Sequence, residues 1–322
     1  MAPVTGGIGR SQRRGETGAA RQGRRAGRAP ESEAAAAAQL AMRAAALLRG
    51  GIAAPRVFDT LSADARLDGI SARITSGVAV PDAIAAEGAQ AWRILAAAWR
   101  LAEMSGAPLA LALERIGGAL RDLERLGERR EVLLSGPKAT VRLVSALPLG
   151  TLALGALLGF DPLPILLTAP GAALLAVGAA LLAAGVTWAR ALRTRVERAD
   201  RVGGIECELL WIATGGGLAP ARARVRVVDV IDSYGARWVG LERFCRGGTL
   251  AATIAAARET GIPLRPLLLE EAADARARAH AALEQAAERL GVLVLLPLGL
   301  CVLPAFIALG VAPVVLSMLG GV

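Results

Sequence analysis

Residues 290–322 read LGVLVLLPLGLCVLPAFIALGVAPVVLSMLGGV and contain no charged residue. A second tract, between Arg142 and Arg190, has Asp161 as its only charge. The chain has 37 basic and 28 acidic residues, and all the others lie outside these two tracts. A soluble protein distributes its charges along the chain, whereas an apolar run of about 20 residues matches the thickness of a bilayer. The two tracts therefore predict an integral membrane protein.

The tract after Arg142 is long enough for two membrane-spanning helices. The first predicted span is 141–160, the Pro-containing turn 161–164 breaks the helix, and the second span is 165–189. The third predicted span is 290–309. The remaining apolar tail, 311–319, is about half as long as a crossing needs, so it predicts an interfacial segment or a continuation of the span. A terminal hairpin is the alternative.

Basic residues flank the predicted spans on one side only. Lys138 and Arg142 lie at the start of the first span, Arg289 precedes the third, and the turn 161–164 has no Lys or Arg. The positive-inside rule therefore places the N-terminus and residues 190–289 in the cytoplasm. Five arginines that follow the second span support this orientation: Arg190, Arg193, Arg195, Arg198 and Arg201.

An internal repeat divides the rest of the chain. Three short motifs occur in the same order in both halves, and two of them combine a small residue or Gly, an aliphatic residue and Pro. That combination predicts a junction at which Gly closes one helix in the left-handed conformation and Pro opens the next. The matched pairs are 48–55 with 214–220, 103–109 with 259–264, and 147–150 with 296–299.

The pattern predicts an all-α membrane protein with two repeated cytoplasmic helical bundles and three transmembrane helices. Apolar residues between the junctions recur at helical intervals, and no segment alternates as a strand does. The predicted parts are a disordered Arg-rich tail (1–33), bundle 1 (34–138), transmembrane helices 1 and 2 (139–189), bundle 2 (190–289), and transmembrane helix 3 with its apolar tail (290–322).

Six glycines and prolines are predicted to shape these helices. Structural turns are expected at Gly106, Pro108, Gly261 and Pro263, and kinks within the spans at Pro148 and Pro297. Each bundle is expected to end in a charged helix that runs toward the membrane. The first, 109–134, is expected to be interrupted at Gly136-Pro137, and the second, 263–289, to run directly into the third span.

No motif for catalysis, a cofactor or a metal is present, so we expect a protein that is not an enzyme. The single Lys has no phosphate-binding loop around it, and one His with three scattered Cys gives no zinc or triad pattern. Gly215-Gly216-Gly217 is interpreted as a helix terminus.

A transporter or channel subunit that acts as an oligomer is one alternative function, although the spans lack charge. A nucleic-acid binder is another, and its stacking surface would be small because the chain has one Tyr.

The pattern resembles the type II secretion F domain family, in its tight-adherence (Tad/Flp pilus) B and C branch. The residues that carry the resemblance are Ser105-Gly106-Ala107-Pro108-Leu109, Thr260-Gly261-Ile262-Pro263-Leu264 and the ending 288–306. The resemblance implies an inner-membrane platform of a pilus or secretion machine. The implied partners are a cytoplasmic secretion ATPase, pilin subunits, a paralogous platform protein in a homo- or hetero-oligomer, and membrane lipid, with no nucleic acid. Two charged clusters would contact the ATPase: Arg121, Glu124 and Arg125, and Glu270, Glu271 and Asp274.

Overall fold

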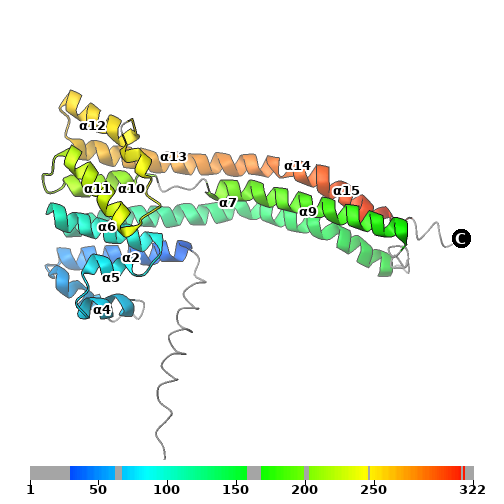
Figure 1. Cartoon of the computed structure of the whole chain (residues 1–322), viewed down its shortest axis with the longest axis horizontal. Coiled ribbons are helices and arrows are strands. Elements are labelled where there is room, and N and C mark those ends of the chain that lie inside the picture. The colour runs from blue at the N-terminus through cyan, green and yellow to red at the C-terminus, as the bar shows by residue number, and fades with distance from the viewer. Residues whose placement is uncertain are drawn as a thin grey trace, which may run out of the picture. The chain divides into compact units, whose positions relative to one another are not determined.

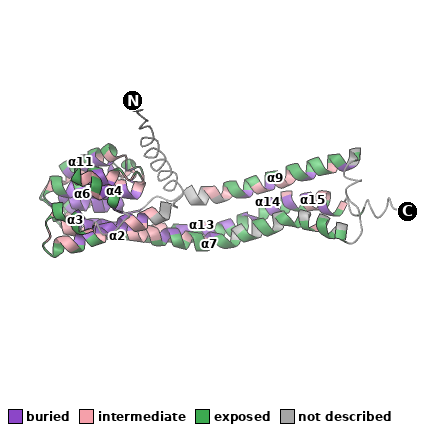
Figure 2. Ribbon diagram, turned by 90° about the horizontal axis from the view of Figure 1, so that it is seen from below, coloured by how far each residue is buried: buried purple, intermediate pink, exposed green. Residues whose placement is uncertain are grey.

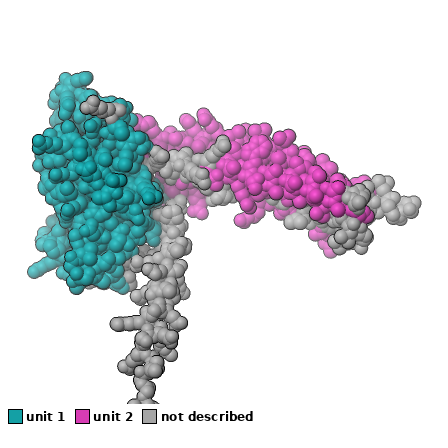
Figure 3. All heavy atoms as spheres, viewed as in Figure 1, with its two compact units in different colours: residues 1–125, 205–272 teal, residues 126–204, 273–322 magenta. Residues whose placement is uncertain are grey.

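The computed structural model describes residues 30–61, 67–157, 168–198, 203–245, 247–312 and 315. Every regular element in these ranges is a helix, which confirms the all-α prediction. The described chain forms two compact units (Figure 3). Unit 1 comprises residues 1–125 and 205–272, and unit 2 comprises residues 126–204 and 273–322.

Three predictions concern residues that lie wholly or mostly outside the described ranges. They are the disordered tail 1–33, the turn 161–164 and the apolar tail 311–319. Residues 30–33 are the exception in the tail, because they already belong to helix α2 (Pro30–Arg49). The predicted end of the tail is therefore a few residues too late.

Helix α6 (Gln90–Ser105) is the centre of unit 1. It packs against α2, α5 (Val80–Ala85), α10 (Ile205–Thr214) and α11 (Pro220–Tyr234) (Figure 1). Its residues 94–99 are buried without a break, so this helix is enclosed on all sides, and many of its buried residues are alanines, which let neighbouring helices approach closely. Helices from both predicted bundles thus share one core. The other elements of this unit are η1 (Ala54–Arg56), α3 (Val57–Leu61), α4 (Asp68–Thr75), η2 (Leu241–Phe244) and α12 (Thr249–Thr260).

The two copies of the repeat have the same local geometry at one junction. Gly106 follows α6 and Gly261 follows α12, and both have a φ of 71° at the helix C-cap. Glycine adopts this left-handed conformation without the steric cost that a Cβ would add. A proline comes next but one in each copy, and a long helix begins directly after it: α7 (Leu109–Leu157) and α13 (Leu264–Leu293).

Helix α7 differs from the sequence prediction. It is 49 residues long and passes through Gly136-Pro137 without a break, so the predicted interruption there is wrong. Proline removes one backbone hydrogen bond and crowds the preceding turn, which bends a helix more often than it ends one when both flanks are strongly helical. Pro148 also lies inside α7. The second charged helix does run directly onward, because Leu264–Val311 is one helical stretch of 48 residues.

Two helices of the described residues are long and apolar enough to cross a membrane. One is the stretch Leu264–Val311, and the other is Gly171–Leu192 within α9 (Ala169–Arg198). They overlap the predicted third and second spans. The predicted first span, 141–160, is not among them; its last residues lie outside the described part, and it stays a prediction. The long stretch continues after α13 as α14 (Leu295–Pro297), η3 (Leu298–Val302), α15 (Leu303–Phe306) and η4 (Ile307–Val311).

Unit 2 has its small residues inside and many of its large apolar side chains outside. A Cβ on Gly185 of α9 would lie 2.9 Å from Cys301 Cβ and 3.0 Å from Val302 Cγ2, so only glycine fits this helix contact. Much of α9 is green in Figure 2 because its residues are exposed, and the exposed large apolar ones are Leu175, Val177 and Trp188. The stretch Leu264–Val311 exposes eight large ones: Val292, Leu293, Leu295, Leu296, Leu300, Leu303, Ile307 and Val311. Such a surface is costly in water and is buried by a bilayer.

Candidate functional site

Helix α10 is completely buried although it contains two carboxylates. All ten of its residues are buried, and Glu206 and Glu208 are 2% and 1% exposed. A buried carboxylate is stable only if it is paired and hydrogen-bonded. We name the surrounding side chains the α10 polar node, and they are Glu206, Glu208 and Trp211 of α10 with Arg115, Arg243 and Arg265.

Glu208 is paired with the first part of α7. Arg115 Nε donates to Glu208 Oε2 at 3.0 Å, and Arg115 Nη2 donates to Glu208 Oε1 at 2.9 Å. This two-point geometry fixes the orientation of both side chains as well as their separation. The pair attaches α7 to α10. Because the carboxylate of Glu208 is buried, removal of its arginine partner is costly.

Trp211 connects the same site to α13. The guanidinium carbon of Arg265 lies 3.9 Å from the centre of the Trp211 ring, and that of Arg115 lies 5.8 Å from it. A guanidinium over an indole face gains a cation–π attraction and loses little packing area. Arg115 belongs to α7 and Arg265 to α13, so one side chain of α10 contacts the beginnings of both long helices.

The other end of α10 is attached to η2. Arg243 forms an ion pair with Glu206, and Cys207 lies between the two carboxylates in sequence. Burial, and then the negative charges of Glu206, Glu271 and Glu208, raise the pKa of the Cys207 thiol. The thiolate is the nucleophilic form of cysteine. Cys207 is therefore held as a neutral thiol, and this cluster serves structure better than chemistry.

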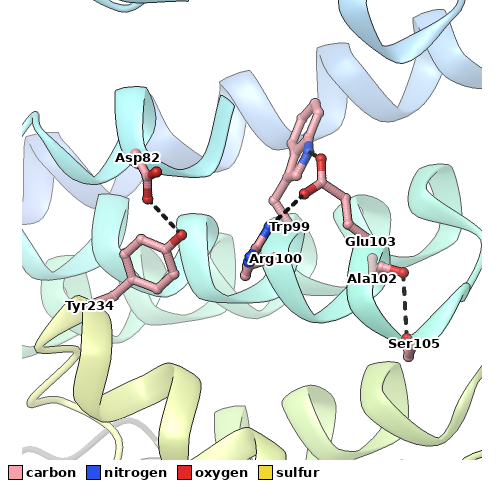
Figure 4. Close-up of polar contacts among 7 residues, drawn as sticks. All are labelled: Asp82, Trp99, Arg100, Ala102, Glu103, Ser105 and Tyr234. Carbon is pink, nitrogen blue, oxygen red and sulfur yellow. Dashed lines mark hydrogen bonds and ion pairs between the residues drawn. The ribbon is translucent and has the colours of Figure 1, made fainter. Parts of the chain in front are cut away.

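Polar contacts also join α11 to α5 and α6 to α10. Figure 4 shows the Tyr234 hydroxyl pointing at Asp82 of α5, to which it donates at 2.8 Å. Ser105 Oγ, at the end of α6, lies 3.3 Å from the carbonyl oxygen of Ile212. A Cβ on Gly216 would overlap the carbonyl of Ser105. Gly215-Gly216-Gly217 thus ends α10 against the end of α6, which confirms its interpretation as a helix terminus.

The residues proposed to contact an ATPase occupy two helices. Arg121, Glu124 and Arg125 lie on α7, and Arg125 pairs locally with Asp122 at 3.3 Å. On α13, Glu270 and Asp274 are exposed one helical turn apart, whereas Glu271 is half-buried. None of the contacts described above joins the first cluster to the second. Their role stays a prediction.

The predicted turn residues lie between helices, and the two predicted kink residues lie within helical stretches. Pro108 and Pro263 precede the first residues of α7 and α13. Pro297 is the last residue of α14 and is followed by η3, a π-helical turn. A π-helical turn follows Pro304 as well, in η4. Proline removes a hydrogen bond of the α-helical pattern, and a wider turn is one way to accommodate the loss.

Sequence reasoning missed the α10 polar node. One signal was available, because Glu-Cys-Glu interrupts the apolar run from Ile205 to Ile212. Two charges in so apolar a helix require partners. The partners themselves lie about 35 to 95 residues away in sequence, in separate elements, and no local pattern identifies them.

The chain was compared with known protein families, curated proteins and solved structures, and no match was found in any of the three. The described residues also contain no group of three or more His, Cys, Asp or Glu side chains placed to hold a metal ion.

Proposed function

We propose that this chain is a membrane platform protein of the type II secretion F domain kind. In this role it sits in the inner membrane with its N-terminus in the cytoplasm and couples a cytoplasmic secretion ATPase to the extraction of pilin subunits and the assembly of a fibre. The proposal rests on the ordered sequence motifs that resemble the family and on the helical architecture described above.

One observation carries the proposal: each long helix has a polar beginning fixed to α10 and an apolar continuation. Arg115 of α7 and Arg265 of α13 both contact Trp211 in unit 1. The stretch that begins with α13 continues to Val311 through residues apolar enough to cross a membrane. A force applied to unit 1 therefore acts on both helices through α10, since neither beginning moves without disturbing a buried contact.

The contacts within unit 2 support the part of the proposal in which three helices span the membrane and pack together. Gly178 and Gly185 of α9 lie against the last helical stretch, and a Cβ on Gly310 would lie 3.3 Å from Thr151 Cβ of α7. Small residues at such contacts are typical of helices that pack together in a membrane. Together they favour three spans: the predicted first span, 141–160, packed with the two apolar helices.

The test is co-purification with the secretion ATPase of the same organism. The charge reversals Glu270→Arg and Asp274→Arg, made together, alter two exposed side chains of α13. We expect this variant to reach the membrane normally and to lose ATPase binding and fibre assembly. The matched control is Glu259→Arg, an exposed reversal at the end of α12, which should leave both unchanged. The proposal is rejected if the ATPase never co-purifies with the wild-type chain and deletion of the gene leaves fibres intact.

A further inference from the structure

The last helical stretch contains two π-helical turns, η3 and η4. In η3 the backbone N–H of Leu303 donates to the carbonyl of Leu298, five residues earlier, and in η4 that of Ala312 donates to Ile307. Such wide turns are rare, and they are found mostly as single turns inside α-helices at functional sites. Two of them in one short stretch require a physical reason.

The buried residues of this stretch do not follow the period of an α-helix. One buried cluster contains residues that recur every four positions: Leu290, Val294, Leu298 and Val302. An α-helix turns by about 100° per residue, so a spacing of four residues drifts by about 40° at each step. Gly310 comes 20 residues after Leu290, and at that distance the drift of an unbroken α-helix amounts to about 200°. Gly310 would then lie on the opposite side of the helix from Leu290.

The two wide turns correct this drift. Each takes one extra residue into a turn, which removes about 100° of rotation. Gly310 is in fact buried, and a Cβ on it would lie 3.3 Å from Thr151 Cβ of α7. Its neighbour Leu309 lies against Gly178 of α9. The wide turns therefore set the register that brings a glycine, and no larger residue, to the contact with α7.

A change of η3 to an ordinary α-turn would alter this contact at no loss of hydrogen bonds. The N–H of Leu303 would donate to the carbonyl of Gly299 in place of Leu298. All residues after η3 would turn by about 100° and advance by about 1.5 Å, so each would take the place of the residue that follows it. Leu309 would then replace Gly310 against Thr151. A leucine does not fit where a single Cβ already lies at 3.3 Å, so the stretch would move away from α7.

Little in the sequence opposes this rotation. Residues 290–322 contain no charge, and the exposed side chains of this part, such as Leu300, Leu303 and Ile307, are apolar. In the proposed membrane location both registers therefore present an apolar surface to lipid, whereas a helix with charged residues would pay for turning them into it. Pro304 favours the wide turn, because in an α-turn its ring crowds the carbonyl four residues earlier.

We propose that η3 is a register switch. In its π form it places Gly310 against Thr151 and closes the contact between the last helical stretch and α7, and in its α form it rotates residues 303–311 and opens that contact. The switch rests on the proposed membrane location of unit 2. Neither an ATPase nor a pilin takes part in it, so it is measured on the purified full chain.

The test is disulfide cross-linking of the full chain in phosphatidylcholine nanodiscs. Thr151→Cys is combined in turn with Gly310→Cys, Leu309→Cys and Val311→Cys, in a chain that also carries Cys245→Ser and Cys301→Ser. A membrane-permeant oxidant forms the disulfides, and mass spectrometry quantifies them. The Gly310 pair reports the closed register and the Leu309 pair the open one, whereas Val311 meets Thr151 in neither. A disulfide has a Cβ–Cβ separation of about 3.8 Å, which the closed register nearly provides.

We expect the Gly310 pair to form fastest and the Leu309 pair about 10- to 100-fold more slowly, as for a minor state of a two-state equilibrium. The Val311 pair should form about tenfold more slowly again, since it needs a contact that neither state contains. Two variants should change the ratio in opposite directions. Deletion of Gly299 removes the extra residue of η3, so the Gly310 pair should persist and the Leu309 pair should fall to the level of the Val311 pair. Pro304→Ala removes the crowding and should raise the Leu309 pair.

Three results would overturn the proposal. One is a wild-type Leu309 pair that forms no faster than the Val311 pair, which is measured without altering η3. Another is loss of the Gly310 pair on deletion of Gly299 in a chain that circular dichroism shows to be folded. The third is an unchanged ratio in Pro304→Ala. Such a static register would leave the platform role untouched, whereas loss of ATPase binding would leave the cross-linking unchanged.

Discussion

Removal of Arg115 should loosen α10, because Arg115 donates two hydrogen bonds to a carboxylate that is only 1% exposed. In Arg115→Met the apolar part of the side chain is retained, and Glu208 loses two hydrogen bonds of 2.9 and 3.0 Å. Breaking a buried ion pair from one side typically costs about 3–5 kcal/mol. Arg115 itself is 30% exposed, so water screens part of the interaction and the lower end, roughly 3 kcal/mol, is expected.

Hydrogen exchange of the α10 amides measures this cost locally. In the native state these amides exchange through opening of the surrounding structure, so a loss of roughly 3 kcal/mol accelerates their exchange by about 100-fold. Glu208→Gln is the matched control. It leaves an amide that still accepts a hydrogen bond from a partly exposed arginine, and it should cost roughly 1–2 kcal/mol.

The combination of both changes completes a double-mutant cycle. Arg115→Met together with Glu208→Gln should cost clearly less than the sum of the two single changes, because the buried charge is removed with its partner. The reasoning is refuted if the exchange of α10 is unchanged in Arg115→Met, or if the two effects are additive within about 0.5 kcal/mol.

Three further outcomes depend on single contacts. Tyr234 is the only tyrosine, so tyrosinate absorbance reports it alone. Burial and the hydrogen bond to Asp82 raise the pKa of Tyr234. The contribution of Tyr234 to stability is therefore full below the pKa of about 10 in the unfolded chain, and it is lost as the pH rises further. Asp82→Asn should move the titration of Tyr234 to lower pH. Cys207 should resist a maleimide reagent at neutral pH until the protein is denatured, whereas the exposed Cys245 should react, and rapid labelling at Cys207 itself would contradict its burial. Gly185→Val should weaken the packing of unit 2 and lower thermal stability in detergent, whereas Gly299→Ala, where a Cβ meets open space, should have little effect.

The local junctions of this fold could be predicted from sequence because they depend on neighbouring residues. Gly106 and Gly261 end helices in the left-handed conformation, and the prolines after them precede the next helices. The same local reasoning was wrong at Gly136-Pro137, where α7 continues. At this point Gly136 directly precedes the proline and is not among the glycines with a positive φ, so no left-handed cap forms and the helix continues with the loss of one hydrogen bond.

Long-range pairing could not be predicted in the same way. Apolar periodicity shows that a helix buries one face, but not which helix covers it. The contact of α6 with α10 and α11, which brings parts of both predicted bundles into one unit, is of this type. The partners of Glu206 and Glu208 are a second example, because an arginine-rich chain offers many candidates and only the tertiary structure selects Arg243 and Arg115.

We propose that apolar helices anchor this chain in a membrane, and we expect unit 1 on the cytoplasmic side. The most direct test is a topology reporter inserted after Gly240, with a second reporter in the turn 161–164. The account predicts that the first is active only in the cytoplasm and the second only outside it. A reporter after Gly240 that responds from the periplasm, or a purified chain that stays soluble without detergent, would contradict the account.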